Sequence, residues 1–246
     1  MNAVFLIAKR DFASYFRGIT GYAIIAVLLL VDGLIFQGIA LSGREQLSSQ
    51  VLSTFFLNSH GVTFAAGVLL TMRLLAEEQH DGTIVLLFTA PVRDWQIVLG
   101  KWLAGVWVVL IFIALTAYMP LMVLMNGSVH PGHIFAGYLG LVLTGFAAVA
   151  IGLLTSALTQ HQVLAAVSGA AIGIGFTFFN WVAKKVDAPF DDVFSYLSMY
   201  DKHFLPSFSK GAIHTRDVVF FLSITFFFLL ATRPVSYTHL TLPTKA

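Results

Sequence analysis

Long apolar runs alternate with short polar segments along the whole chain. A transmembrane helix needs about 20 consecutive apolar residues, and runs of this kind recur six times. The spans predicted from them are residues 19–41, 54–76, 102–125, 134–158, 163–183 and 216–232. The pattern therefore predicts an all-α, polytopic integral membrane protein with one transmembrane domain over residues 1–233.

The first 17 residues have a different, amphipathic pattern. Apolar residues recur there at helical spacing, with basic residues between them: Val4, Phe5, Ala8, Phe12, Tyr15 and Phe16, and Lys9, Arg10 and Arg17. This predicts a helix that lies in the membrane interface, the alternative being a basic flank of the first span.

The basic residues before the first span predict the orientation. Three precede that span and only Arg44 follows it closely, so the positive-inside rule places the N-terminus in the cytoplasm. Other basic residues fall outside in this topology, but long loops weigh little in the rule: Lys184, Lys185, Lys202, Lys210 and Arg216.

Composition narrows the functional classes. The chain is 58% hydrophobic with a mean hydropathy of +0.85, which is more apolar than a soluble core can bury. Only 11% of residues are charged and the net charge is +2, which argues against a nucleic-acid partner. The chain has no cysteine, which excludes disulfides and thiolate chemistry.

The last residues, 234–246 (PVSYTHLTLPTKA), abandon the apolar pattern. Residues 235–244 resemble the translation of a sequencing adapter. We expect this tail to be non-native, to have no function and to replace the native C-terminus.

Two spans carry ridges of small residues at four-residue spacing. They are Gly140, Thr144, Ala148, Gly152 and Ser156 on the fourth, and Ala165, Gly169, Gly173 and Thr177 on the fifth. Small residues let membrane helices approach closely, so the ridges predict tight packing against each other or a neighbour. A substrate groove is the alternative.

Asp32 lies near the middle of the first span. A carboxylate there costs about 2.5–3.5 kcal/mol on insertion scales, so it should face the bundle interior, a water-filled cavity or a subunit seam. It is either a proton or substrate site, or a protonated or hydrogen-bonded structural acid, with Gln37 or a Ser or Thr of another span as its partner.

The sequence contains no recognisable catalytic or metal-binding set. None of its eight histidines forms HExxH, and we find no intramembrane protease arrangement. Residues 41–46 superficially resemble the signature of ABC ATPases, but no GxxxxGK[ST] phosphate loop occurs. We therefore expect no enzyme activity, no catalytic residue and no metal site in this chain.

A polar stretch, residues 72–101, interrupts the apolar pattern between the second and third spans. Arg73 and Glu77 are four residues apart and can pair on one helix face, although Glu77 and Glu78 could also be a solvated helix end. The sequence Asp81-Gly82-Thr83 can end that helix and cap the next.

A short apolar helix is then predicted over Thr83 to Thr89. Pro91 ends it, because the residue before a proline avoids the α region. A new helix is expected from Asp94, with Gly100-Lys101 at the membrane entry. A short helix between two breaks on the cytoplasmic side has the shape of a coupling helix.

The stretch LLAEEQHDGTIVLLFTAPVRDWQIVLGKWLAG is similar to the first cytoplasmic loop of type 2 ABC exporter permeases, most of all those of gliding motility and nitrous-oxide-reductase maturation. The matching residues are Glu77, Glu78, Gly82, Thr83, Leu86, Leu87, Pro91, Val92, Gly100 and Lys101. The resemblance continues into residues 194–232, at Phe204, Phe208, Gly211, Asp217 and Val218. Arg93 departs from the family, which often has Ser or Thr there, and leaves Asp94 as the expected helix cap.

The resemblance implies a permease of the bacterial inner membrane, with six spans and an N-terminal interfacial helix. Its implied partners are membrane lipid, a second permease copy or a homologous permease, and an ABC ATPase subunit. ATP and magnesium would bind to that ATPase, and this chain would hold no cofactor. The alternative function is a membrane anchor or scaffold of an ATPase-driven export, motility or maturation machine. Residues 184–215 could form an outer gate or a partner site, but we favour a partly interfacial helix.

Overall fold

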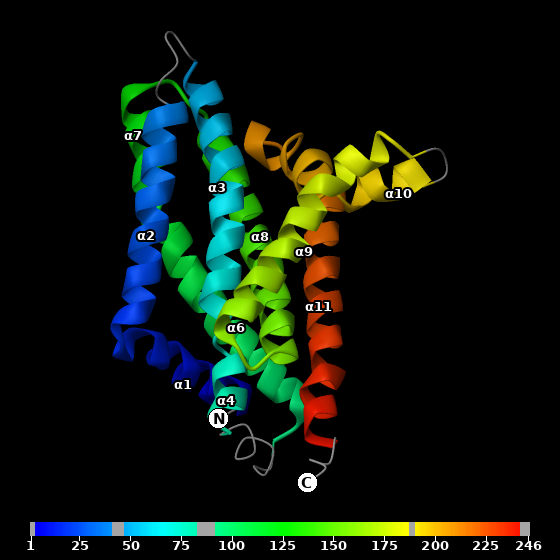
Figure 1. Ribbon diagram of the computed structural model, residues 1–246. Helices are drawn as coiled ribbons and strands as arrows, with labels where there is room; N and C mark the ends of the chain where they lie inside the picture. The colour runs from blue at the N-terminus through cyan, green and yellow to red at the C-terminus, as the bar shows by residue number, and fades with distance from the viewer. Residues whose placement is uncertain (1–2, 41–46, 83–91, 187–189, 242–246) are drawn as a thin grey trace.

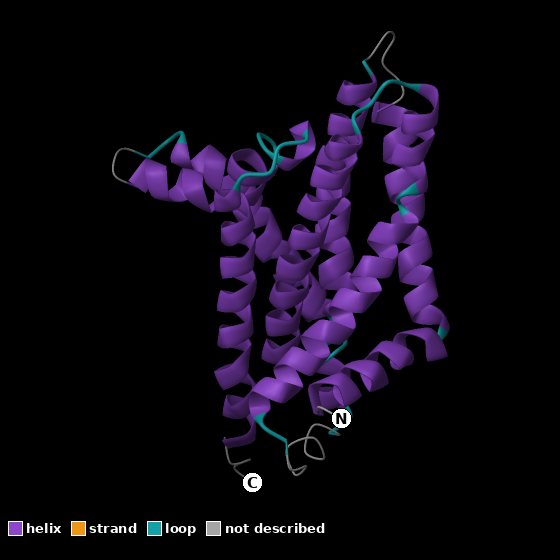
Figure 2. Cartoon of the chain, turned by 180° about the vertical axis from the view of Figure 1, so that it is seen from behind, coloured by secondary structure: helices purple, strands orange, loops and turns teal. Residues whose placement is uncertain are grey.

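A computed structural model describes residues 3–40, 47–82, 92–186 and 190–241 of the chain. Within these ranges every regular element is a helix (Figures 1 and 2). Long helices run side by side as a bundle, and α1 (Ala3–Arg17) lies across one end of it. Both termini lie at that end, which also holds α4 (Ala76–His80) and is called the α4 end below.

The other helices follow in chain order. They are α2 (Ile19–Ile35) with its π-helical continuation η1 (Phe36–Ala40), α3 (Ser48–Thr71), α6 (Asp94–Leu115), α7 (Tyr118–Asn126), α8 (Pro131–Leu158), α9 (Gln162–Ala183), α10 (Phe190–Leu197), η2 (Met199–Phe204), η3 (Phe208–Lys210) and α11 (Thr215–Thr241). The end opposite α4 is called the α10 end.

Five candidate spans among the described residues are long and apolar enough to cross a membrane. They are Ile19–Ile39, Ser48–His80, Asp94–Met125, Pro131–Leu158 and Thr215–Arg233. The apolar part of α9, Gln162–Thr177, is shorter than these five. The all-α polytopic fold is therefore confirmed, while the count of six spans stays a prediction.

The third span, predicted over residues 102–125, consists of two helices. The first ends at Leu115 and the second begins at Tyr118. Pro120 accounts for the break, because proline has no N–H to donate to the carbonyl of Thr116 and its ring crowds that carbonyl. The carbonyl of Thr116 accepts instead from the backbone N–H of Met119, at 3.1 Å.

Two other boundaries differ from the sequence-based prediction. The helix of the second span begins at Ser48, six residues before the predicted start at residue 54. The polar segment 48–53 is helical as well. At the opposite terminus α11 runs to Thr241, so the change of composition at Pro234 does not end the helix. The non-native origin of that tail stays a prediction.

The small residues of α8 and α9 lie against α3 and against the segment before α11. A Cβ on Gly152 would overlap the Thr71 side chain, and one on Gly173 would overlap the Phe64 ring. A Cβ on Gly169 would come within 2.6 Å of Val68 Cγ1, and one on Gly140 within 2.6 Å of Phe208 Cβ. Both ridges therefore use the missing side chain to bring a neighbour closer.

The residues of the second resembling stretch form an anchor at the α10 end. Asp217, buried in the first turn of α11, accepts from the Nδ1–H of His203 at 2.7 Å and from the Ser207 hydroxyl. The His203 ring also stacks on Phe220, with centroids 3.7 Å apart. Gly211 has a left-handed φ of +80°, which turns the chain from η3 towards α11.

Beside this anchor, the upper part of α9 and α10 lean away from the bundle (Figure 1). Phe179 of α9 and Phe194 of α10 hold the two helices together, with ring centroids 5.8 Å apart. Phe190 and Val193 of α10 are exposed. This exposed apolar face is compatible with the interfacial helix favoured for residues 184–215, which stays a prediction.

Replacing Gly152 by alanine should destabilise the bundle, because the new methyl group would overlap Thr71 and come 3.1 Å from Val68 Cα. Overpacking of this kind costs about 1–3 kcal/mol. Gly175→Ala is the matched control: its Cβ meets nothing within 4 Å, and alanine gains up to about 1 kcal/mol in helix propensity. Thermal unfolding in detergent should show opposite shifts in Tm. Equal Tm values for the two variants would contradict this packing.

Candidate functional site

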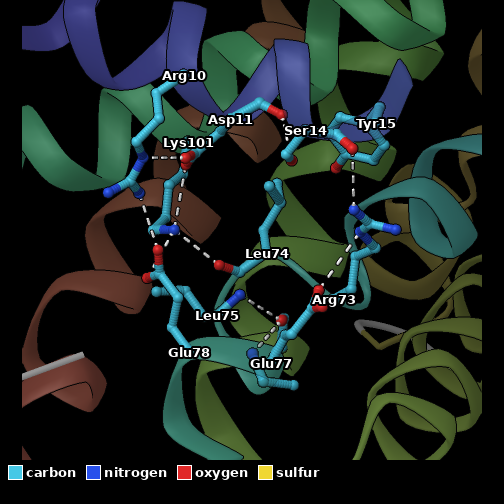
Figure 3. Close-up of polar contacts among 12 residues, drawn as sticks. Arg10, Asp11, Ser14, Tyr15, Arg73, Leu74, Leu75, Glu77, Glu78 and Lys101 are labelled. Atoms are coloured by element: carbon cyan, nitrogen blue, oxygen red, sulfur yellow. Dashed lines mark hydrogen bonds and ion pairs between the residues drawn. The ribbon is translucent and has the colours of Figure 1, made fainter. Parts of the chain in front are cut away.

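Charged side chains from three separate helices meet at the α4 end (Figure 3). Arg10 and Asp11 come from α1, Glu78 from α4 and Lys101 from α6. These four residues are called the charge cluster below. Its four members lie on three helices that are far apart in sequence, so the cluster forms only in the folded chain.

Lys101 is at the centre of the charge cluster and only 1% exposed. Its Nζ lies 2.8 Å from Glu78 Oε2 and 3.2 Å from Asp11 Oδ2, and it donates to the carbonyl of Leu74 at 2.7 Å. A buried ammonium is tolerated only when it is paired and hydrogen-bonded. The three oxygen atoms meet that requirement.

Arg10 closes the charge cluster on its solvent side. Its Nε donates to Asp11 Oδ1 at 2.7 Å and its Nη2 to Glu78 Oε1 at 2.9 Å. Burial alone would lower the pKa of Arg10, but the hydrogen bonds and charges of Asp11 and Glu78 outweigh it and raise the pKa above its ordinary value. Two cations and two carboxylates therefore neutralise one another.

Gly100, next to Lys101, allows α1 to reach this position. A Cβ on Gly100 would lie 2.8 Å from Ile7 Cβ and 3.0 Å from the carbonyl oxygen of Val4. Ile7 and Ile97 are buried together there, with Val92 packed against them. The Gly-Lys pair thus has one structural consequence, which is the close docking of α1 on α6.

A second set of contacts joins α1 to the turn after α3. Arg73 Nη2 donates to the carbonyl of Ser14 at 3.4 Å, and its guanidinium lies 5.1 Å from the centroid of the Tyr15 ring. The Tyr15 hydroxyl donates to the carbonyl of Leu70 at 2.5 Å. Burial raises the pKa of Tyr15, so the phenol stays a donor. The predicted pair of Arg73 and Glu77 is present, at 3.5 Å.

Ser156 of α8 holds the break between α3 and α4. Its Oγ accepts from the backbone N–H groups of Leu75 at 3.0 Å and Ala76 at 2.9 Å, and donates to the carbonyl of Met72 at 2.8 Å. These are the backbone groups that a helix break leaves without intrahelical partners. One hydroxyl therefore fixes where α3 stops and α4 starts.

The predicted coupling residues fall into three groups. Glu78, Gly100 and Lys101 lie together, whereas Glu77 lies at the surface beside Arg73. Gly82 has a φ of +68° after the end of α4, the left-handed conformation that commonly ends a helix. The other predicted coupling residues, Thr83, Leu86, Leu87 and Pro91, lie outside the described residues, as does the short helix predicted over Thr83 to Thr89.

The cap predicted for the third span was wrong. Arg93, not Asp94, is the N-cap residue of α6, and Asp94 is in the first helical turn. The backbone N–H of Arg93 donates to Gln96 Oε1 at 2.9 Å. A side chain three residues into the helix thus satisfies the terminus, so no Ser or Thr is needed at the cap position.

Asp11 and Ser156 are the residues of this site that the sequence interpretation missed. Asp11 could have been identified from its spacing, because it lies four residues from both Ile7 and Tyr15 and therefore on the same helix face. All three residues are buried in α1. An acid on the apolar stripe of a basic helix needs a partner. Ser156 was recognised only as a small residue of a ridge.

Two polar hollows flank α4. One of about 320 Å³ lies over the charge cluster and includes Ser14, Arg17 and Asp81. The other, about 640 Å³, lies between α4 and the turn from α8 to α9, and is lined by Glu77, His80, Asp81, Gln160, His161, Gln162, Val163 and Leu164. No group of three or more His, Cys, Asp or Glu residues in the described ranges could hold a metal ion. The α4 end is therefore a polar surface with side chains of both signs.

Lys101→Met should destabilise the fold strongly, because Asp11 and Glu78 would lose the buried cation between them. Breaking a buried pair by removing one partner costs about 3–5 kcal/mol. Lys9→Met, on the exposed face of α1, is the matched control and should change stability by no more than about 0.5 kcal/mol. Thermal unfolding in detergent measures both variants. The charge cluster would have no structural role if the two variants unfolded alike.

Comparison with protein families identifies the family of this chain. No curated protein matches the chain. A family model described as "ABC-2 family transporter protein" matches residues 15–200, which include α2 to α9 and most of the charge cluster's elements. Because the match covers well over half of its 246 residues, the chain belongs to the ABC-2 family of transporter proteins, and it is a multi-pass membrane subunit of the ABC permease type.

Proposed function

We propose that this chain moves a substrate across the bacterial inner membrane, using ATP that a separate ATPase subunit hydrolyses. Family membership supports the permease type, and association with an ABC ATPase and a second permease copy follows from that type. The ATPase is proposed to dock at the α4 end, on the predicted coupling helix over Thr83 to Thr89 and the polar surface beside it. ATP and magnesium would be held by the ATPase.

The way in which α4 is attached to the bundle is the observation that carries this proposal. Glu78 ties α4 to α1 and α6 through Lys101, and Ser156 ties its start to α8. On its other side, Gln79 Nε2 donates to the carbonyl of Ala157 at 2.9 Å. A force applied to the segment after Gly82 would therefore act through α4 on three other helices, α1, α6 and α8.

The packing of α3 supports a rigid-body movement. Its residues Val68 and Thr71 lie against Gly152 of α8, where close-packed contacts leave little room for independent sliding. Packed helices of this kind shift as units. Closure of the ATPase subunits would thus be passed through α4 to α3 and α6, and would change the path between two permease copies.

Charge supports a cytoplasmic α4 end. Lys9, Arg10 and Arg17 all lie on α1, which crosses that end just before the first span. The ATPase is a cytoplasmic protein in ABC transporters, so the same orientation puts the proposed docking surface on the side where the ATPase is found.

An apolar cavity of about 370 Å³ supports transport rather than scaffolding. It lies between α3 and α9, and Gly173 of the α9 ridge is among its lining residues, with His60 and Phe64. This cavity supports the substrate groove considered as the alternative for this ridge.

Leu87→Asp should reduce copurification of the ATPase subunit about tenfold or more, because a charge would replace the apolar face of the predicted coupling helix. Tenfold corresponds to about 1.4 kcal/mol, within the range for an interface residue. Val193→Asp, the same change at an exposed residue of the α10 end, is the control and should leave copurification unchanged. Pull-down of the coexpressed subunits from detergent extracts measures both.

Equal copurification of the two variants would contradict the docking surface. Substrate-stimulated ATPase activity of the reconstituted complex distinguishes a transporter from an anchor. The anchor function would be favoured if the complex assembles normally but no compound extracted from the cell membrane stimulates its ATPase activity.

A further inference from the structure

Asp32 is a buried acid in the last turn of α2, outside the proposed docking surface. It is 1% exposed, although its neighbours Val31 and Leu34 are 39% and 60% exposed. Val31 and Leu34 thus face outward, while Asp32 faces α3 on the buried side of α2. The docking of an ATPase does not explain why an acid is buried at this position.

The hydrogen bonds of the carboxyl group can be counted. Oδ1 accepts from the Ser59 hydroxyl of α3 at 2.8 Å. Oδ2 is equally buried and has no hydrogen-bond partner within the described ranges of the chain. Gln37, considered as a partner from the sequence, is exposed on η1.

None of the described polar side chains on the helices around Asp32 forms a hydrogen bond with its Oδ2. The Thr116 hydroxyl donates to the carbonyl of Ile113, so at 3.4 Å the Tyr138 hydroxyl can donate to Thr116. Tyr118 of α7 approaches the backbone of α2 at Gly33. His60, next to Ser59, packs its ring against Phe204, with centroids 4.4 Å apart. None of the described cationic side chains forms an ion pair with Asp32.

A charged carboxylate would be poorly compensated here. One hydrogen bond to a charged group contributes about 1.5–3 kcal/mol, and the second oxygen would have no donor at all. A proton on Oδ2 removes the charge and leaves Oδ1 as a carbonyl oxygen that accepts from Ser59. Only the Oδ2–H group then lacks a partner, which is the smaller cost in an apolar interior.

We propose that Asp32 is an intramembrane proton-binding site, with the proton on Oδ2 and the Ser59 hydroxyl on Oδ1. The site joins α2 to α3, and it lies one turn before the π-helical segment η1, a helix irregularity often found at functional sites. Its proton affinity therefore depends on the contact between α2 and α3. By linkage, the bound proton in turn favours that contact.

Infrared difference spectroscopy of the full chain in lipid nanodiscs tests the site. The C=O stretch of a protonated carboxyl group is resolved from the amide bands and shifts in D₂O. We expect this band in the wild type at neutral pH and its loss in Asp32→Asn. Asp192→Asn, which changes an exposed acid of α10, should keep the band.

A second variant keeps the test independent of how Asp32→Asn folds. Ser59→Ala removes the donor to Oδ1, so the same band should remain and move to higher wavenumber. The proposal is overturned by a wild-type spectrum without this band, by a band that Asp32→Asn leaves in place, or by a band that Ser59→Ala does not move.

Discussion

The buried ammonium of Lys101 is the interaction on which the α4 end depends. It is surrounded by the carboxylates of Asp11 and Glu78 and the carbonyl of Leu74, so it fixes α1, the turn after α3, α4 and α6 relative to one another. A charge in this position cannot be left unpaired, because desolvation would cost several kcal/mol. The contacts around Lys101 therefore depend on one another, because the loss of one charge would leave another buried without a partner.

The helix α3 connects this end to the rest of the bundle. At its end, Ser156 of α8 fixes the break before α4. Along its length, glycines of α8 and α9 bring neighbouring backbones close to it. Near its middle, Ser59 reaches Asp32 on α2. A movement that begins at α4 thus meets three kinds of contact in order: hydrogen bonds at a helix break, close apolar packing, and one polar contact inside the membrane.

Local rules predicted the features that depend on neighbouring residues. The pair of Arg73 and Glu77 follows from four-residue spacing, and the turn at Gly82 from the freedom of glycine at positive φ. The break before Tyr118 had a local cause as well, in Pro120, and was overlooked. The cap of α6 was misassigned because Gln96, three residues inside the helix, satisfies the backbone of Arg93.

The sequence by itself determined the class of the protein: long apolar runs separated by polar segments leave only a helical membrane fold, because backbone groups must be satisfied within each span. The sequence also identified three residues whose roles had to be explained: Gly100, Lys101 and Asp32. Only the tertiary structure decided their partners. Lys101 meets Asp11 across 90 positions and Asp32 meets Ser59 across 27, and such contacts depend on which helix faces are pressed together. No spacing rule along a single helix contains that information.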